Sequence, residues 1–152
     1  MHKPYFPKKE GHPLPLRAEF RRRVRFEEVD PLGIVWHGRY PSYFEDARTA
    51  LGDKYCIGYN ILYQHGVVTP IRQFHIDYFA SLRFDQEFVI EGIQHYSESA
   101  RINTEYVIRD SYGKITTRGY TVQMFLDLEG NILIDFPDFF AAFAERWKRD
   151  KL

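Results

Sequence analysis

At 152 residues the chain is long enough for one domain, and contents of 44% hydrophobic and 17% aromatic residues exclude a chain that is disordered throughout. Its 21 basic and 21 acidic side chains balance, which argues against nucleic acid as the main partner. A single cysteine, Cys56, excludes an internal disulfide framework, and we predict that it is a small buried side chain. No apolar run is long enough to span a membrane, and Met1 to Lys9 lack the apolar core of a signal peptide. We therefore expect a cytoplasmic protein without membrane insertion.

The first half of the chain predicts an arm, a strand and a long helix. Residues 1–16 contain four of the eight prolines and are predicted to form an extended arm, which leaves residues 17–152 as a single domain. The first strand is predicted from Ala18 to Phe26, with side chains that alternate between two faces. A helix should start at about Pro41, because proline suits the first helical position, and end near Cys56. Its buried stripe follows helical spacing: Tyr40, Phe44, Ala47, Leu51 and Tyr55.

The second half of the chain changes to a period of two, which indicates strands. The predicted strands cover the alternating run around Phe74, Ile76 and Tyr78, then residues 88–95, 100–109 and 114–128. A short helix is predicted at 60–65, and a last helix begins at an Asp138 cap. One long helix against one antiparallel sheet is an α+β layout.

The stretch between the first strand and the long helix carries the best candidate for chemistry. Asp30 precedes a Pro-Leu-Gly turn, and His37 follows seven residues later, just before the helix begins. The apolar residues between them could partly desolvate the carboxylate and make it a stronger base. The new helix offers unpaired backbone N–H groups to a developing oxyanion. An alternative from spacing alone is that Asp30 only forms the turn and His37 only packs or caps the helix.

Other kinds of reactive site have weaker support in the sequence. The histidines are scattered, with no spacing typical of metal ligands, and neither a phosphate-binding glycine loop nor a G-x-S-x-G nucleophile motif occurs. We therefore expect no metal and no cofactor.

The stretch from Phe26 to Arg48 resembles the hot-dog-fold acyl-CoA thioesterases, most closely the 4-hydroxybenzoyl-CoA thioesterase family and its tol-pal-associated branch. The residues that match this motif, in order, are Asp30, Gly33, His37, Tyr40, Phe44, Glu45, Ala47 and Arg48. Arg83-Phe84-Asp85 resembles a second family element, and the resemblance extends over about 21–128. Val29, Pro31, Trp36 and Gly38 depart from the family pattern, and Pro31 and Trp36 leave the acyl preference open.

The resemblance implies a sheet wrapped around the long helix, in subunits that pair their sheets edge to edge as homodimers or homotetramers with active sites at the subunit interface. It implies acyl-CoA as the substrate, Asp30 as nucleophile or general base, and His37 as the group that positions the thioester or its water. Backbone N–H groups at the helix start would polarise the thioester carbonyl. The predicted substrate-binding residues are Gly33, Val35, Trp36, Gly38 and Tyr40.

Two further questions stay open from the sequence. Four arginines could hold the phosphates of coenzyme A, although each is more simply a solvated strand residue: Arg72, Arg83, Arg101 and Arg118. The same fold also serves as an acyl-CoA-binding module without hydrolysis or as a structural oligomer, and fold alone does not decide among these functions.

Overall fold

The computed structural model describes residues 2–152 and contains a five-stranded sheet, a two-stranded sheet and three α-helices. In chain order the elements are β1 (Leu16–Arg23), η1 (Phe26–Glu28), η2 (His37–Arg39), α1 (Tyr40–Tyr55), α2 (Tyr59–Gln64), β2 (Val67–Val68), β3 (Ile71–Tyr78), β4 (Glu87–His95), β5 (Arg101–Asp110), β6 (Ile115–Met124), β7 (Leu126–Asp127) and α3 (Asp138–Lys148).

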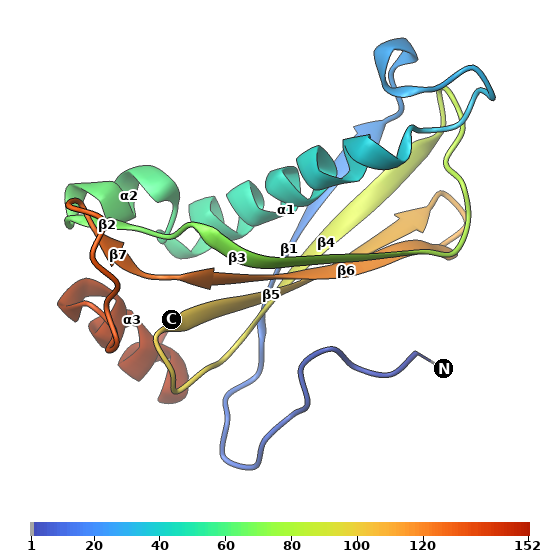
Figure 1. Ribbon diagram of the computed structural model, residues 1–152. Helices are drawn as coiled ribbons and strands as arrows, with labels where there is room; N and C mark the ends of the chain where they lie inside the picture. The colour runs from blue at the N-terminus through green and yellow to red at the C-terminus, as the bar shows by residue number, and fades with distance from the viewer. Residues whose placement is uncertain (1) are drawn as a thin grey trace.

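The large sheet is antiparallel throughout, in the order β1-β4-β5-β6-β3, and α1 lies across one of its faces (Figure 1). The predicted α+β layout, with one long helix against an antiparallel sheet, is confirmed. β2 and β7 form the separate two-stranded sheet near α2 and α3. The edges of the large sheet are β1 and β3, so within residues 2–152 the N–H and C=O groups on their outer sides have no neighbouring strand.

Helix α1 is held by the stripe of residues that its sequence predicts. Tyr40, Phe44, Ala47 and Leu51 are all at most 2% exposed, and the Phe44 ring stacks on Tyr106 of β5 at a centroid distance of 4.4 Å. The helix ends where Cys56 takes a left-handed conformation (φ 57°) and donates its N–H to the carbonyl of Gly52. The prediction that Cys56 is buried is wrong: this capping position points the side chain into solvent.

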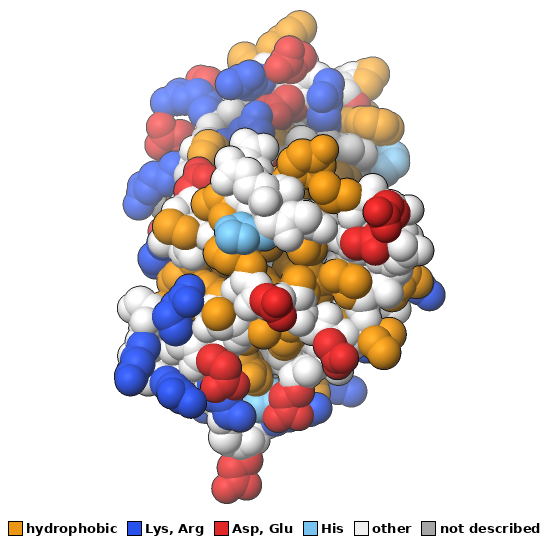
Figure 2. Space-filling model, turned by 90° about the vertical axis from the view of Figure 1, so that its left-hand side faces the viewer, with side chains coloured by type: hydrophobic (Ala, Val, Ile, Leu, Met, Phe, Trp, Pro, Cys, Tyr) orange, Lys and Arg blue, Asp and Glu red, His pale blue; other side chains and the backbone are white. Residues whose placement is uncertain are grey.

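A second group of core residues joins α3 to the end of α1 and to the sheet. Phe140, Phe143 and Trp147 of α3 pack with Leu62 and Phe125. The predicted cap is wrong by one residue, since Pro137 is the N-cap and Asp138 lies in the first turn, without a side-chain capping bond. Figure 2 views this end of the molecule, where hydrophobic side chains are visible among charged side chains of both signs.

Strand β1 starts two residues earlier than predicted and ends at Arg23, not Phe26. The chain turns away because Glu28, only 4% exposed, accepts hydrogen bonds from the Arg25 N–H (2.8 Å) and from Arg22 (3.0 Å). These bonds form the short 3-10 helix η1 in place of the last residues of the predicted strand. Phe26 is 80% exposed as a result.

The N-terminal arm lies along the face of the sheet opposite α1 (Figure 1). Tyr5 donates a hydrogen bond to Asp77 (2.6 Å), and its ring lies 4.6 Å from the guanidinium carbon of Arg118. Beneath the arm, Arg118 donates to Glu105 at 2.7 Å, and both side chains are nearly buried. The interpretation of Arg118 as a solvated strand residue is therefore wrong, because the arm and this ion pair remove it from solvent.

The pair under the arm predicts a pH-dependent stability. Burial alone would raise the pKa of Glu105, but hydrogen bonds from His95 and Arg118 outweigh it and hold that pKa below its ordinary value of 4.5. The contribution of Glu105 to the free energy of unfolding is therefore fully present above the pKa that its carboxyl has in the unfolded chain. This contribution is lost as the pH falls through the lower pKa of the folded protein. We expect Glu105→Gln to lower the free energy of unfolding by about 2 kcal/mol at pH 7, with a smaller loss near pH 3. Urea unfolding at both pH values measures this loss.

The exposed pair of Glu87 with Arg23 gives the matched control. Glu87→Gln should change the free energy of unfolding by less than about 1 kcal/mol. A Glu105→Gln loss that is no larger than this at pH 7 would contradict the prediction.

Candidate active site

The segment from Val29 to Val35 forms a small hairpin. The Asp30 N–H donates to the carbonyl of Ile34 and the Gly33 N–H donates to the carbonyl of Asp30, each at 2.9 Å. Gly33 has φ +74°, a conformation that favours glycine and that closes this kind of turn. The Oδ1 atom of Asp30 accepts the Leu32 N–H at 2.8 Å, so one carboxylate oxygen shapes the turn and the other remains for a substrate or water.

Backbone bonds hold this hairpin against the connection between β3 and β4. The Val35 N–H donates to the carbonyl of Leu82 at 2.8 Å, and Ile34 forms a bridge with Arg83. The Trp36 N–H donates to the carbonyl of Glu28 at 3.0 Å. Asp30 therefore has a fixed position relative to the sheet, as a reactive carboxylate requires.

His37 lies at the start of the short helix η2, which leads directly into α1. The Tyr78 hydroxyl donates to the His37 carbonyl at 2.7 Å and so ties the helix start to the end of β3. The Trp36 ring lies 5.2 Å from the imidazole and covers Gly38 so closely that a Cβ atom there would be 2.4 Å from the indole. A glycine at position 38 thus allows the indole to lie on the backbone of the helix start.

Asp30 and His37 line the same hollow, with a volume of about 310 Å³. Its lining residues are Asp30, Ile34, Val35, His37, Tyr40, Tyr78, Phe79, Ala80 and Ser81. The hollow brings together four predicted site residues, Asp30, Val35, His37 and Tyr40. The other predicted residues lie beside it: Gly33 in the turn, and Trp36 and Gly38 stacked on each other.

The electrostatics of the hollow depend on the partners of each side chain. Asp30 is half-buried, and within residues 2–152 no hydrogen bond joins its side chain to His37. Burial raises the pKa of both Tyr40 and Tyr78, so these phenols are protonated hydrogen-bond donors at neutral pH. The site thus combines a carboxylate, an imidazole and two phenols at a helix start.

Sequence reasoning did not identify Tyr78 as a site residue. Its alternation with polar residues indicates only a strand, and nothing in its local pattern shows that the end of β3 returns to the start of α1. Of the arginines considered for coenzyme A, Arg118 is covered by the arm, whereas Arg72, Arg83 and Arg101 are exposed.

Among residues 2–152, no three His, Cys, Asp or Glu side chains are grouped in a way that could hold a metal ion. Over the same residues, no helix is both long and apolar enough to cross a membrane.

The model of the thioesterase-like superfamily matches residues 24–144, which include the hairpin, the hollow and the sheet around α1. The chain belongs to the thioesterase-like superfamily. YneP of Bacillus subtilis (strain 168), whose acyl-CoA thioesterase name is provisional, is 32% identical over 99 residues. These residues are 65% of this chain and 62% of YneP, so the chain spans about six-tenths of that relative's length.

Solved structures of thioesterases share the fold of this chain. The DHNA-CoA thioesterase of Staphylococcus aureus superposes with a TM-score of 0.74 at 22% identity, over 85% of this chain and 89% of that chain. The 1,4-dihydroxy-2-naphthoyl-CoA thioesterase of Synechocystis gives a TM-score of 0.74 at 16% identity, over 84% of this chain and 95% of that chain. The hot-dog fold expected from the motif is thereby confirmed.

Proposed function

We propose that this chain hydrolyses acyl-CoA thioesters to a free acid and coenzyme A at the hollow that contains Asp30 and His37. The observation that carries the proposal is the position of a half-buried carboxylate and an imidazole at the start of α1, in a member of the thioesterase-like superfamily. We further propose that, within the superfamily, the chain belongs to the 4-hydroxybenzoyl-CoA thioesterase family and its tol-pal-associated branch.

In the proposed reaction, Asp30 either attacks the thioester carbonyl or takes a proton from the water that attacks it. His37 orients the thioester or that water. The first N–H groups of the helix have no carbonyl within the helix to bond, so they stabilise the oxyanion. When the C–S bond breaks, the thiolate of coenzyme A leaves and takes up the proton that water gives up. If Asp30 is the nucleophile, water then hydrolyses the anhydride between Asp30 and the acyl group, which releases the free acid and restores the carboxylate. Val35 and Tyr40 in the hollow, with Gly33, Trp36 and Gly38 beside it, contact the substrate in this proposal.

A hydrolysis screen tests the proposal directly. Purified protein is incubated with aryl-, short-chain and long-chain acyl-CoA thioesters, with and without EDTA, and the release of free thiol is followed by a thiol-reactive dye. We expect release from at least one class, at the same rate in EDTA. Acyl-CoA binding without thiol release would instead favour a binding module, and lost activity that zinc restores would refute the metal-free mechanism.

His37 should affect turnover less than Asp30, because in this mechanism it positions a reactant and does not carry the main proton transfer. We expect His37→Ala to lower kcat by about tenfold. His65→Ala is a matched control, since His65 lies at the end of α2 and stacks on Phe139. Steady-state kinetics on both variants measure the difference. If His37→Ala lost as much of kcat as the Asp30 variant, Asp30 and His37 would act as one catalytic pair whose contributions cannot be separated.

We also propose that the subunits pair through β3. This edge strand exposes apolar side chains at Ile71, Phe74 and Tyr78 and the charged Arg72. The other edge, β1, exposes one large apolar side chain, Phe20, among more charges: Arg17, Glu19, Arg21 and Arg23. Charged edges resist strand pairing, so β3 is the favoured interface. We expect a homodimer or homotetramer by light scattering at micromolar concentration. A monomer at that concentration would contradict the shared interface.

A further inference from the structure

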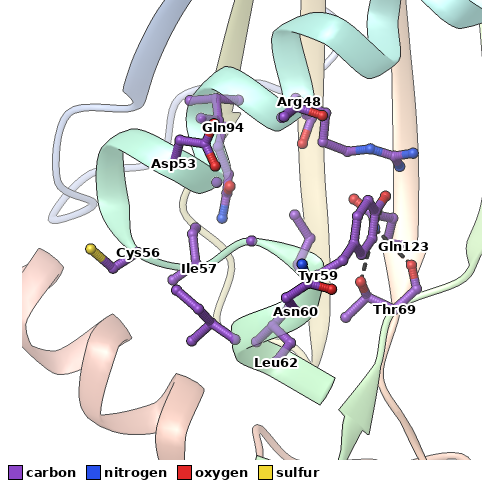
Figure 3. A pocket seen from close by; sticks show the side chains of 17 residues that line it. Arg48, Asp53, Cys56, Ile57, Tyr59, Asn60, Leu62, Thr69, Gln94 and Gln123 are labelled. Carbon is purple, nitrogen blue, oxygen red and sulfur yellow. Dashed lines mark hydrogen bonds between the residues drawn. The ribbon is translucent and has the colours of Figure 1, made fainter. Parts of the chain in front are cut away.

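A second cavity, of about 540 Å³, lies at the opposite end of α1 from the hollow (Figure 3). It is lined by the C-terminal half of α1, by α2 and by β4, β5 and β6. Its apolar lining includes Leu51, Ile57, Leu62 and Ile102, each at most 8% exposed. Such a lining suits the hydrocarbon part of a small ligand.

Arg48 gives this apolar cavity polar donors. Its side chain is only 11% exposed, and its Nη2 atom donates to Glu45 one turn earlier on α1. The Nε and Nη1 atoms are buried and have no hydrogen-bond partner within residues 2–152. A buried N–H group without a partner is costly, so a ligand that supplies an acceptor here would remove that cost.

The surroundings of Arg48 keep it in place. The Tyr59 ring lies 5.2 Å from the guanidinium carbon, and the Gln123 amide donates to the Thr69 carbonyl at 2.7 Å and to the Tyr59 hydroxyl at 3.5 Å. Figure 3 shows Arg48, Tyr59, Gln123 and Thr69 on one side of the cavity. The guanidinium thus lies at the cavity wall against the Tyr59 ring of α2, whose hydroxyl is in turn bonded by Gln123 of β6.

The charges around the cavity select the kind of acceptor. Glu45 already neutralises Arg48, and Asp53 adds a negative charge to the lining. A ligand carboxylate would meet a site with no net positive charge. A neutral acceptor, such as a hydroxyl or a keto oxygen, can instead bond to the free guanidinium nitrogens without charge repulsion.

Strand β3 connects this cavity to the hollow of a second subunit. At one end Ile71 pairs with Gln123 of the cavity, and at the other end Tyr78 lines the hollow. The two ends are about 23 Å apart at the usual rise of a strand. An antiparallel pair of β3 strands related by a twofold axis at mid-strand would place Tyr78 of one subunit beside Ile71 of its partner. The hollow of one subunit would then adjoin the cavity of the other.

We propose that this cavity receives the far end of the acyl group whose thioester lies in the partner subunit's hollow, and that Arg48 selects acyl groups with a neutral hydrogen-bond acceptor at that end. This inference rests on the proposed thioesterase function and on pairing through β3. It assigns a substrate class, acyl groups with a terminal hydroxyl or keto oxygen, and names Arg48 as the residue that determines specificity.

Binding of non-hydrolysable thioethers tests the selection without requiring turnover. S-alkyl-CoA thioethers with octyl and dodecyl chains, each with and without a terminal hydroxyl, are titrated into the parent protein and into Arg48→Met by calorimetry. We expect the parent to bind the hydroxylated member of at least one pair about tenfold more tightly, and Arg48→Met to bind both members of each pair equally. Arg48→Leu likewise removes every N–H donor of this side chain, so it should lose the preference too and serves if the Met variant does not fold.

Arg109→Met is the matched control, because Arg109 is a strand arginine paired with Glu91 away from the cavity. This variant should keep the preference of the parent. A parent without preference at either length, or a preference that persists in both Arg48 variants, would overturn the assignment. Thiol release from octanoyl-CoA is measured in parallel: selective binding without release overturns only the hydrolysis, and release without selectivity overturns only the role of Arg48.

Discussion

Asp30→Asn should lower kcat for thioester hydrolysis by at least about a hundredfold while the protein keeps its fold and binds substrate. Asparagine is nearly the same size, and its side-chain oxygen can still accept the Leu32 N–H that shapes the turn. It cannot, however, act as a carboxylate base or nucleophile. Steady-state kinetics on parent and variant measure the loss, with circular dichroism and light scattering to verify folding and assembly.

Asp110 supplies a matched control for this substitution. Its Oδ1 atom accepts the Tyr112 N–H at 2.9 Å in the turn between β5 and β6, which is the bond that Asp30 makes in its own turn. Asp110 does not line the hollow. Asp110→Asn should therefore leave kcat unchanged. If Asp30→Asn turns over within a few-fold of the parent, Asp30 is only a turn residue and the mechanism is wrong.

Phe44→Ala should produce the largest loss of stability, about 4 kcal/mol in the free energy of unfolding. The side chain is 1% exposed and stacks between Tyr106 and Phe74, with centroid distances of 4.4 and 5.8 Å. Its removal would leave a void between α1 and the sheet that the rigid stack cannot fill. Urea denaturation measures the change, at one protein concentration because assembly affects apparent stability.

The same chemical change at Phe26 provides the comparison. Phe26 is 80% exposed and contacts Phe84 edge to face at a centroid distance of 5.9 Å. Phe26→Ala should change the free energy of unfolding by less than about 1 kcal/mol. If the two variants lost the same stability, the core around α1 would not depend on the stack at Phe44.

The parts of the fold predicted well are those set by local periodicity. The stripe from Tyr40 to Leu51 identified α1 because helical spacing alone decides which side chains share a face. The end of β1 was missed because Glu28 bonds back to Arg22 and Arg25, which alternation in the strand does not reveal. Cys56 was misplaced for a similar reason, since its exposure follows from the left-handed helix end and not from its hydrophobicity.

For the candidate site, the sequence could identify residues that are close in the chain but not those brought in by the sheet. Asp30 and His37 lie in one short segment with a likeness to a known motif. Tyr78 reaches them only through the pairing of β3 with β6 and the bonds of the connection that follows β3. The sequence around Arg118 does not distinguish it from an exposed strand arginine, because the arm that covers it is more than a hundred residues away in the chain. Arg118 donates a hydrogen bond to the carbonyl of Lys3, which is 115 positions away.

The strand order has a consequence for the order in which the chain can fold. β4, β5 and β6 follow one another and pair as neighbouring hairpins, which are local contacts that form quickly. β1, at the edge of the sheet, pairs with β4, and the paired residues Arg23 and Glu87 are 64 positions apart. During synthesis β1 therefore leaves the ribosome before β4 and waits until β4 has followed. Its exposed charges, including Glu19, Arg21 and Arg23, discourage pairing with strands of other chains during that interval.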